Sequence, residues 1–438
     1  MIFHIGALVK TLESVSRTMA DLKFEGEYQI LSETQLNLVI NVLEKRGFTN
    51  ETVSVKSVGK SGDNYIASVK RIIAERNDGE SFSMIAKIAP TMEAVRNVMN
   101  TVLLFMNEIV MYSEILPKFA EILDSENLPK DQIYRTPACY GYLSDAPNEI
   151  ILLEDLQLCH FEILDRHKPL SNECIKLALY DLAILHSLSY VMQNRHPEIT
   201  NYYKQRLLNL WAVLSSFEEM RTSLQQLDTD IVSLVDKEKH KEAFYDTIAN
   251  FTKKVGLQHN NALKSNYSVI LHGDCWTNNI MFRLEDGKVV ESCFIDYQVS
   301  KAGSPAEDIL YLILNCTDHK TRCENYGDWI DFYHAQLDKS LQNFGLDANR
   351  VYPRDQLDVD LKTHGRLSLA LSTILTNVIC RESEESVDLK ESSDKNDDKF
   401  MEAASDSLRV TTMKEETRQR FKKMIEGYIE SLLQFGLI

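Results

Sequence analysis

The sequence predicts an α+β protein of two lobes, a small β-rich lobe followed by a larger and mostly helical one. Segments with the two-residue alternation of β-strands gather in the first third of the 438 residues. Segments with apolar residues at helical spacing fill most of the remainder. The two patterns meet at Glu154 and Asp155, so we expect an N-terminal lobe over residues 28–154 and a C-terminal lobe over residues 155–438.

The N-terminal lobe is expected to combine helices and strands. Residues 32–48 carry apolar side chains at helical spacing, and so do residues 92–116, a helix that is expected to end before Pro117. Alternating β-branched residues predict three antiparallel strands, and Asn77-Asp78-Gly79 predicts the hairpin turn between the last two. These strands and two later ones cover residues 52–58, 65–73, 81–88, 138–143 and 149–153.

The C-terminal lobe is expected to be helical, apart from a β-rich stretch at residues 268–296. Residues 381–407 are polar and acidic, and we expect a solvated loop there. The candidate helices cover residues 172–192, 202–225, 229–256, 306–316, 327–344, 355–380 and 413–435.

Residues 1–27 are expected to form an N-terminal extension that precedes the first lobe. Met19 opens a stretch that is typical of an ordinary start, so residues 1–18 are hypothesised to be an optional part of that extension. Mass spectrometry of the N-terminal peptide of native protein would test this, and a peptide that begins at Met1 would contradict it.

The composition argues against several classes of partner. A formal net charge of −17 repels nucleic-acid phosphates and anionic membranes, so we expect neither as a partner. The sequence has no stretch that approaches the roughly 18 apolar residues of a membrane span. The eight cysteines form no C-x-x-C pair, which favours free thiols in a reducing compartment over a disulfide framework. We therefore expect a cytoplasmic protein, and we take a monomer as its expected state.

The most informative segment is Val269–Phe282, which contains the pattern H-x-D-x-x-x-x-N as His272, Asp274 and Asn279. One predicted strand enters this segment and another leaves it. The strand after that ends at Asp296, which therefore lies beside the loop that carries Asp274 and Asn279. Alone the pattern is weak, because acids in a polar hairpin connection can be turn residues only. The flanking strands and the position of Asp296 make it specific.

These residue types are the ones that phosphoryl transfer requires. The attacking hydroxyl must be oriented and must lose a proton, which Asp274 can accept. Magnesium prefers hard oxygen ligands, and the carboxylate of Asp296 with the amide oxygen of Asn279 would supply them. We expect His272 to brace the loop by hydrogen bonding rather than to titrate. The segment therefore predicts the transfer of a phosphoryl group from Mg²⁺-bound ATP.

Upstream residues fit the nucleotide side of such a site. Gly59 and Gly62, with Asn64 next to them, lie between two predicted strands, where the backbone can approach phosphates. The segment lacks the Walker A pattern, and a plain hairpin turn is the alternative. Lys87 stands on an otherwise apolar strand, where a charge needs a partner, and Glu108 on the following helix is the expected one. The alternative is a Lys that reaches the strand edge and a solvated Glu.

Two further segments are candidates for supporting roles. The segment that joins the lobes can offer backbone N–H and C=O groups to the edge of an adenine, and Glu154 and Leu156 are the candidates for these contacts. Asp308 lies at the start of the helix predicted over residues 306–316. It is expected either to tie this helix to the loop that carries Asp274 or to cap the helix.

Taken in order, these motifs resemble the ecdysteroid kinase-like family, part of the choline/aminoglycoside kinase-like group. The resemblance covers roughly residues 28–436, and the ordered set is specific although no single piece is. The motifs are Gly62-Asp-Asn-Tyr65, Glu108-Ile-Val-Met-Tyr112, Leu153-Glu-Asp-Leu156, Leu182-Ala-Ile-Leu-His186, Leu271–Phe282, Phe294-Ile-Asp-Tyr-Gln298 and Ser304-Pro-Ala-Glu-Asp308.

The resemblance implies a bilobal protein-kinase-like fold, the use of ATP with Mg²⁺, and phosphorylation of a hydroxyl on a small molecule. Ecdysteroids and foreign compounds are the acceptors that it implies, so detoxification is one implied role. It further implies that Asp274 is the catalytic aspartate, that Asn279 and Asp296 bind the metal, and that Lys87 binds phosphate.

The sequence departs from the family pattern at two positions. Tyr297 stands where the family usually has Phe, and Ser187 follows His186 where Ala is usual. Neither change removes a reactive group, so neither argues against activity.

Three other functions compete with a kinase of ecdysteroid-like or xenobiotic acceptors. A choline or ethanolamine kinase should need an acidic and aromatic cage for its cationic acceptor, which the sequence does not reveal. A catalytically silent nucleotide-binding scaffold usually lacks one of the polar roles, whereas all of them are filled here. A protein kinase should carry H-R-D, D-F-G and A-P-E, which are missing.

Overall fold

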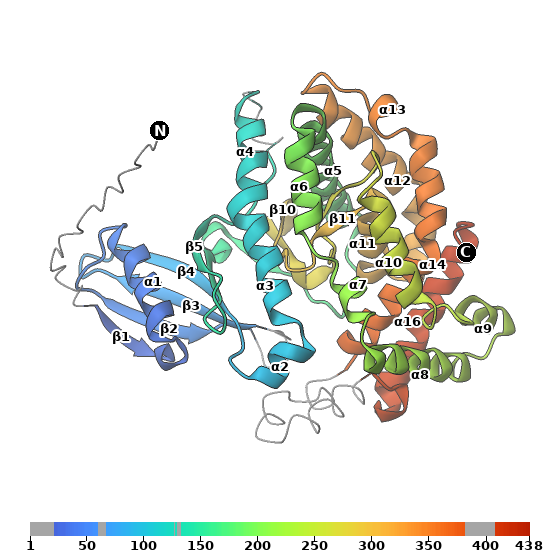
Figure 1. The fold of residues 1–438 in the computed structure, drawn as a ribbon, viewed down its shortest axis with the longest axis horizontal. Coiled ribbons are helices and arrows are strands. Elements are labelled where there is room, and N and C mark those ends of the chain that lie inside the picture. Colours follow the sequence, from blue (N-terminus) through green and yellow to red (C-terminus); the bar gives the residue numbers. More distant parts are fainter. Residues whose placement is uncertain (1–21, 60–66, 127, 129–132, 382–407) are drawn as a thin grey trace, which may run out of the picture.

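The computed structural model describes residues 22–59, 67–126, 128, 133–381 and 408–438. It has a β-sheet lobe from the first part of the chain and a helical lobe from the rest, and Figure 1 shows the two side by side. The predicted two-lobed α+β class is therefore confirmed. Gly62 and Asn64, and the acidic loop after Arg381, lie outside the described residues, and so do residues 1–21.

The N-terminal lobe is built on a six-stranded sheet with the order β1-β2-β3-β4-β6-β5. β2, β3 and β4 pair antiparallel as predicted, β6 and β5 continue the sheet in antiparallel pairs, and β1 pairs parallel with β2. β1 comes from residues that the sequence assigned to the extension, so the sheet begins before residue 28. The strands are β1 Lys23–Gly26, β2 Thr52–Ser57, β3 Ser68–Glu75, β4 Ser81–Ile88, β5 Cys139–Leu143 and β6 Ile150–Glu154.

Helix α1 (Glu33–Glu44) covers one face of this sheet. It follows a short 3₁₀ turn, η1 (Tyr28–Ile30), and it begins with a capping box in which Ser32 and Gln35 bond each other's backbone N–H. Its buried side chains, Val39 and Leu43 among them, pack against the sheet in a small core of its own.

The predicted helix over residues 92–116 is interrupted and runs further than expected. It forms α2 (Glu93–Val98), α3 (Thr101–Val110), a π-helical turn η2 (Met111–Ile115) and α4 (Leu116–Asp124). The prediction that it ends before Pro117 is wrong. Pro117 lies in the first turn of α4, where its missing N–H costs no helical hydrogen bond. The wider π turn before it lets the helix continue from α3 into α4.

The C-terminal lobe is mostly helical, as predicted, and shares one large core. The predicted helix over residues 202–225 is broken where Asn209 caps a new helix by accepting the N–H groups of Trp211 and Ala212. The helix predicted over residues 229–256 is interrupted after Leu234 and again after Phe244. The helices are α5 Asn172–Arg195, α6 Pro197–Arg206, α7 Leu210–Leu214, α8 Glu218–Leu234, α9 Glu238–Phe244, α10 Phe251–Ala262, α11 Pro305–Cys316, α12 His319–Gln342, α13 Ala348–Val351, α14 Arg354–Ile379 and α16 Glu415–Gln434, with the 3₁₀ turns η4 Leu156–Cys159, η5 Thr277–Asn279 and η7 Val410–Thr412.

Helix α5 is the centre of this lobe. Among the described residues it is the one helix that is long and apolar enough to cross a membrane, and 83% of its most apolar window is buried inside the structure. It packs against α12, β8 and β10, so contact with other parts of the protein accounts for its hydropathy. All eight cysteines are free, as predicted.

Two small antiparallel sheets position the site. The first has the order β10-β9-β7 and the second joins β11 to β8. β7 was missed because three residues are too few to show an alternating pattern. The strands are β7 Phe161–Ile163, β8 Val269–Leu271, β9 Ile280–Glu285, β10 Lys288–Phe294 and β11 Lys301–Gly303.

Candidate active site

The loop between β8 and β9 presents two of the predicted residues together. It turns at Gly273, whose φ of +86° lies in the left-handed region and whose added Cβ would lie 2.4 Å from the carbonyl oxygen of Val299. Only glycine fits there. The turn η5 then brings Asn279 back, so that its Nδ2 donates to Asp274 Oδ2 at 2.8 Å and to the backbone oxygen of Asp274 at 3.0 Å.

Asp274 is held by donors at both carboxylate oxygens. The hydroxyl of Tyr311 on α11 donates to its Oδ1 at 2.7 Å, while Asn279 occupies Oδ2. Burial raises the pKa of Asp274 to about 7, the charge of Asp296 adds to the rise, and the Tyr311 hydrogen bond opposes it. A carboxylate with a pKa near neutrality is suited to accept a proton at neutral pH.

His272 and Asp308 brace this loop from below. Asp308, buried on α11, accepts the backbone N–H of His272 at 2.8 Å and that of Gly273 at 2.9 Å, and its Oδ2 lies 3.2 Å from His186 Nε2. Ser304 caps α11, so of the two roles expected for Asp308 the tie to the loop is the one observed. The Nε2 of His272 lies 3.0 Å from the carbonyl oxygen of Ile295.

His272 is fully buried and neutral. Its Nδ1 accepts the N–H of Asp274 at 3.2 Å, so Nε2 carries the hydrogen that it donates to Ile295. Burial lowers the pKa of His272. These contacts agree with the bracing role that the sequence predicted for it.

Asp296 follows β10 and reaches the same point from another direction. Phe294 pairs with Ile280, and the N–H of Ile295 donates to the carbonyl oxygen of Asn279 at 3.0 Å, which brings Asp296 next to the loop. Asp296 has a φ of +67°, an uncommon conformation for a residue with a side chain. Such backbone conformations concentrate at functional sites.

The Tyr that replaces the usual Phe follows Asp296 directly. Tyr297 is fully buried, and its hydroxyl lies 2.9 Å from that of Tyr134. Its ring meets that of Tyr112 edge-on, with the centroids 5.4 Å apart. The additional hydroxyl therefore has a hydrogen-bond partner, and it does not point at the site as an unpaired polar group.

Lys87 joins the N-terminal sheet to the site. Its Nζ lies 2.6 Å from Glu108 Oε2 on α3 and 2.6 Å from Asp296 Oδ1. The predicted Lys87–Glu108 pair is therefore present, and the alternative of two solvated side chains is excluded because both are buried. Burial by itself lowers the pKa of Lys87, but the charges of Asp296 and Glu108 more than offset this and raise it above its ordinary value.

Glu108 is the least satisfied member of this group. Burial raises its pKa to about 7, against the opposing charge of Lys87, and its buried Oε1 has no side-chain hydrogen-bond partner in the described part of the chain. The Lys87 ammonium thus lies between one carboxylate that is fully buried and another, Asp296, that is 27% exposed.

The donor set fits a magnesium ion. Asp296 offers a partly exposed carboxylate. Asn279 uses its Nδ2 for its hydrogen bonds to Asp274, and among the described residues its amide oxygen has no donor. Among those residues no group of three or more His, Cys, Asp or Glu side chains could hold a metal ion. Two hard oxygen ligands completed by substrate phosphates and water are the usual environment of Mg²⁺, so these residues fit it.

The remaining candidates for nucleotide contacts are placed less directly. Gly59 follows β2 with a φ of +83°, while Gly62 and Asn64 lie outside the described residues. The N–H of Glu154 donates to the carbonyl oxygen of Ala138 at 2.8 Å, so it is not available to an adenine. Its carboxylate forms an ion pair with Arg135 at 2.6 Å.

In the part of the chain that the structure describes, the backbone N–H of Leu156 is free to contact an adenine, as its predicted role requires. Leu156 opens η4, and among the described residues this N–H has no acceptor. The side chain of Asp155 next to it pairs with Arg71 of β3 at 2.7 Å and accepts from Ser83 at 2.7 Å, which ties the connection between the lobes to the sheet. The prediction for this segment is therefore narrowed to Leu156 and the carbonyl side of Glu154.

Tyr311 is the residue that the sequence argument missed. It lies on α11 three positions after Asp308, so both side chains are on the face of that helix that meets the loop. That spacing was the available signal, but an aromatic residue in an apolar helix is ordinarily assigned to the core.

The family of this chain follows from a comparison with known family models. The model of the ecdysteroid kinase-like family matches residues 61–346, which is more than half of the chain. The chain belongs to this family. The predicted resemblance is confirmed, and with it the protein-kinase-like type of the two-lobed fold. The family is one of small-molecule kinases.

The solved structures that the chain resembles include kinases of small molecules. One is an ethanolamine kinase from Plasmodium vivax, at 13% identity over 89% of this chain and 91% of that one, with a TM-score of 0.39. Another is the GDP complex of an aminoglycoside 2′-phosphotransferase, at 15% identity over 89% and 99%, with a TM-score of 0.35. At such identities and scores these likenesses say nothing about the substrate. A search of curated proteins gives no match.

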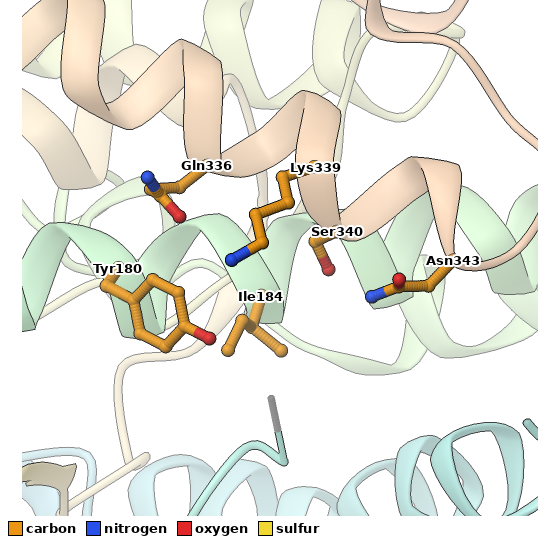
Figure 2. A pocket seen from close by; sticks show the side chains of 6 residues that line it. All are labelled: Tyr180, Ile184, Gln336, Lys339, Ser340 and Asn343. Carbon is orange, nitrogen blue, oxygen red and sulfur yellow. The ribbon is translucent and has the colours of Figure 1, made fainter. Parts of the chain in front are cut away.

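A shallow depression lies apart from the site, between α5 and α12. Figure 2 shows the side chains that line it, and none of them is a candidate site residue. Its volume of about 10 Å³ is close to the smallest that can hold a single water molecule. It therefore offers no room for a nucleotide or an acceptor.

Proposed function

We propose that this chain is an ATP- and Mg²⁺-dependent kinase that transfers the γ-phosphate to a hydroxyl of a small, neutral acceptor of the ecdysteroid or xenobiotic class. The observation that carries the proposal is the convergence of Lys87, Asp274, Asn279 and Asp296, which come from β4, the β8–β9 loop and the segment after β10. Family membership supports the reaction type, and the acceptor class is our proposal.

The mechanism assigns one task to each of these residues. Asp274 accepts the proton of the acceptor hydroxyl while the hydroxyl oxygen forms a bond to the γ-phosphorus and the bond from that phosphorus to the β–γ bridging oxygen breaks. Lys87 leaves its pairing with Asp296 and contacts the phosphates of ATP, while Glu108 keeps it in place. Asn279 and Asp296 would hold Mg²⁺, which neutralises charge on the phosphates when it is bound.

The pairings within the site give Lys87 and Asn279 suitable starting positions. Lys87 is already desolvated and is 2.6 Å from each of its carboxylate partners, so it needs no further burial to meet a phosphate. Asn279 can hold Asp274 with its Nδ2 and offer its oxygen to a metal at the same time, because the two atoms belong to one planar amide.

The direct test is transfer of labelled γ-phosphate from Mg·ATP to a panel of ecdysteroids, plant phenols and glycosides, choline and ethanolamine. We expect a steroid or phenol to be labelled by the wild type and not by Asp274→Asn. If choline or ethanolamine alone were labelled, the acceptor class would be wrong. A wild type that neither binds Mg·ATP nor labels any member would contradict the kinase and favour a silent scaffold.

Two properties beyond the reaction remain proposals. The eight free cysteines support a reducing compartment, and we propose the cytoplasm, which fractionation of tagged protein would test. The monomeric state is a prediction that light scattering on purified protein would check.

A further inference from the structure

Asn107 is a fully buried residue to which the reaction assigns no task. It lies on α3 next to Glu108 and is 1% exposed. Consecutive residues of a helix point about 100° apart, so Glu108 faces Lys87 while Asn107 faces the helical lobe. In Figure 1, α3 stands between the sheet and the helical lobe.

The amide of Asn107 bonds two segments of the helical lobe at once. Its Nδ2 lies 2.8 Å from the carbonyl oxygen of Leu208, 3.2 Å from that of Gln298 and 3.3 Å from that of Ser300. Its Oδ1 accepts the N–H of Leu208 at 3.0 Å. Both ends of the amide are therefore used, and all of the acceptors are backbone atoms whose positions depend on the path of the chain.

Both segments lead to the candidate site. Gln298 and Ser300 lie in the segment shortly after Asp296, and the hydroxyl of Ser300 donates to the carbonyl oxygen of His272 at 3.2 Å. Leu208 lies between α6 and α7, just before the capping residue Asn209. One side chain thus connects the helix of Glu108 to the metal side, to the β8–β9 loop and to the start of α7.

We propose that Asn107 is a positioning residue of the transfer reaction, which fixes α3 and its Glu108 relative to the 296–300 segment so that Lys87 meets the phosphates at a set distance from Asp296. This inference rests on the proposed function. A carboxamide is suited to the task because it presents donors and an acceptor in one plane at this length, whereas aspartate has no N–H and glutamine is longer by one methylene.

The test compares Asn107→Asp and Asn107→Ala with Asn377→Ala as a matched control. Asn377 is also a fully buried Asn that donates to a backbone carbonyl, that of Leu408 at 3.0 Å, but it lies on α14 away from the site. We expect both Asn107 variants to lower kcat/KM for ATP by about 10- to 100-fold, because displacements of about 1 Å have costs of this size. The control should lose a similar amount of thermal stability and keep its rate.

Two readouts distinguish positioning from general destabilisation. In the Asn107 variants the backbone N–H of Leu208 should exchange with solvent faster, and in Asn377→Ala it should stay protected. Lys87→Met combined with Asn107→Ala should bind Mg·ATP no more weakly than Lys87→Met alone, since the two residues act through one contact.

The results that overturn the inference are separate from those that overturn the function. A wild type that binds and transfers normally, together with Asn107 variants that do the same or that resemble Asn377→Ala in rate, would refute this inference alone. A wild type that binds no Mg·ATP would refute the proposed function, and this inference with it.

Discussion

The two sides of the candidate site are held in place by different interactions. On the loop side, Asp274 and Asn279 are fixed by hydrogen bonds to one another and by Asp308, which accepts two backbone N–H groups underneath them. On the lysine side, Lys87 is fixed between Glu108 and Asp296 by charge. The contacts on the loop side can all persist when substrate binds. On the lysine side, a phosphate of ATP can replace Asp296 as a partner of Lys87.

The pKa shifts of two buried acids show the same difference. Burial raises the pKa of Asp308, but hydrogen bonds and charge from its neighbours, His186 first, more than offset this and hold it below its ordinary value. For Glu108 burial outweighs the charge of Lys87, and its pKa rises to about 7. Several donors thus keep the pKa of a buried carboxylate low, whereas the pairing of Glu108 with Lys87 does not fully offset the effect of its burial.

The largest effects should come from the residues nearest to the transferred group, one on each side. Asp274→Asn should lower the transfer rate by about 10²–10⁴-fold and leave Mg·ATP binding nearly intact, because only the general base is lost. Asp296→Ala should abolish transfer and also weaken magnesium-dependent ATP binding while the fold survives. Rate assays with calorimetric titration check both. Near-wild-type rates in both variants would show that the site assignment is wrong.

The loss of the Asp308 carboxylate, which holds the β8–β9 loop, should have the largest effect on stability. Asp308→Ala leaves the buried N–H groups of His272 and Gly273 without acceptors, and we expect a loss of about 3 kcal/mol in the free energy of unfolding. Urea denaturation measures it. The control is Asp318→Ala, which removes an acceptor from the start of α12 and should cost about 1 kcal/mol. Equal losses would contradict the special role of Asp308.

Tyr311→Phe tests whether the hydroxyl of Tyr311 is needed to position Asp274. A hydrogen bond to a charged group contributes about 1.5 kcal/mol or more, so its loss should lower kcat by about tenfold and leave KM for ATP unchanged. Tyr190→Phe removes another buried phenol hydroxyl, one that donates to the carbonyl oxygen of Tyr267, and should keep its rate. If the two variants have the same kcat, Tyr311 does not position Asp274.

Glu108→Gln should have a smaller effect on stability than Asp308→Ala. Gln resembles the protonated form that burial already favours, and Lys87 keeps its pairing with Asp296, so we expect a loss of about 1 kcal/mol in the free energy of unfolding. The affinity for Mg·ATP should fall about tenfold, because Lys87 is held less firmly, at 1.4 kcal/mol per factor of ten. Unchanged affinity would mean that Asp296 alone holds Lys87.

A buried acid outside both sides extends the comparison to pH. Burial raises the pKa of Asp181 to about 8, and the hydroxyl of Ser292 is its one hydrogen-bond partner among the described residues. Its pKa in the unfolded chain is about 4. Between these values the folded state keeps a proton that the unfolded state releases, so the free energy of unfolding falls as pH rises.

The variant Asp181→Asn should lack this dependence. Relative to the wild type, its free energy of unfolding should rise by about 1 kcal/mol for each pH unit between pH 5 and 7. Denaturant titrations at several pH values measure the difference. A constant difference over this range would show that Asp181 is ionised in the folded protein.

Much of this architecture could be predicted from local patterns. The alternation that predicts β2 to β4 and the spacing that predicts α5 and α11 are properties of a few neighbouring residues, so the sequence shows them directly. Predictions were less accurate where a few atoms decide where a helix or strand begins or ends. The path through Pro117, the breaks at Asn209 and the three-residue strand β7 depend on single caps and turns, which periodicity does not report.

The sequence by itself determined which residues could carry the chemistry. His272, Asp274 and Asn279 lie within one loop, and Asp296 comes just after the second strand that follows it, so the order of the chain places them together. The charge of Lys87 on an apolar strand also required a partner, and Glu108 on the following helix was the available one.

Only the tertiary structure decided how these residues are held. Lys87 meets Asp296 across 209 positions of sequence, Asp274 meets Tyr311, and Asn107 meets Leu208 across 101 positions. It also decided that the N–H of Glu154 is used within the sheet. The physical reason is that periodicity depends on which face of an element is buried, whereas a hydrogen bond depends on how two distant elements pack within a fraction of an ångström.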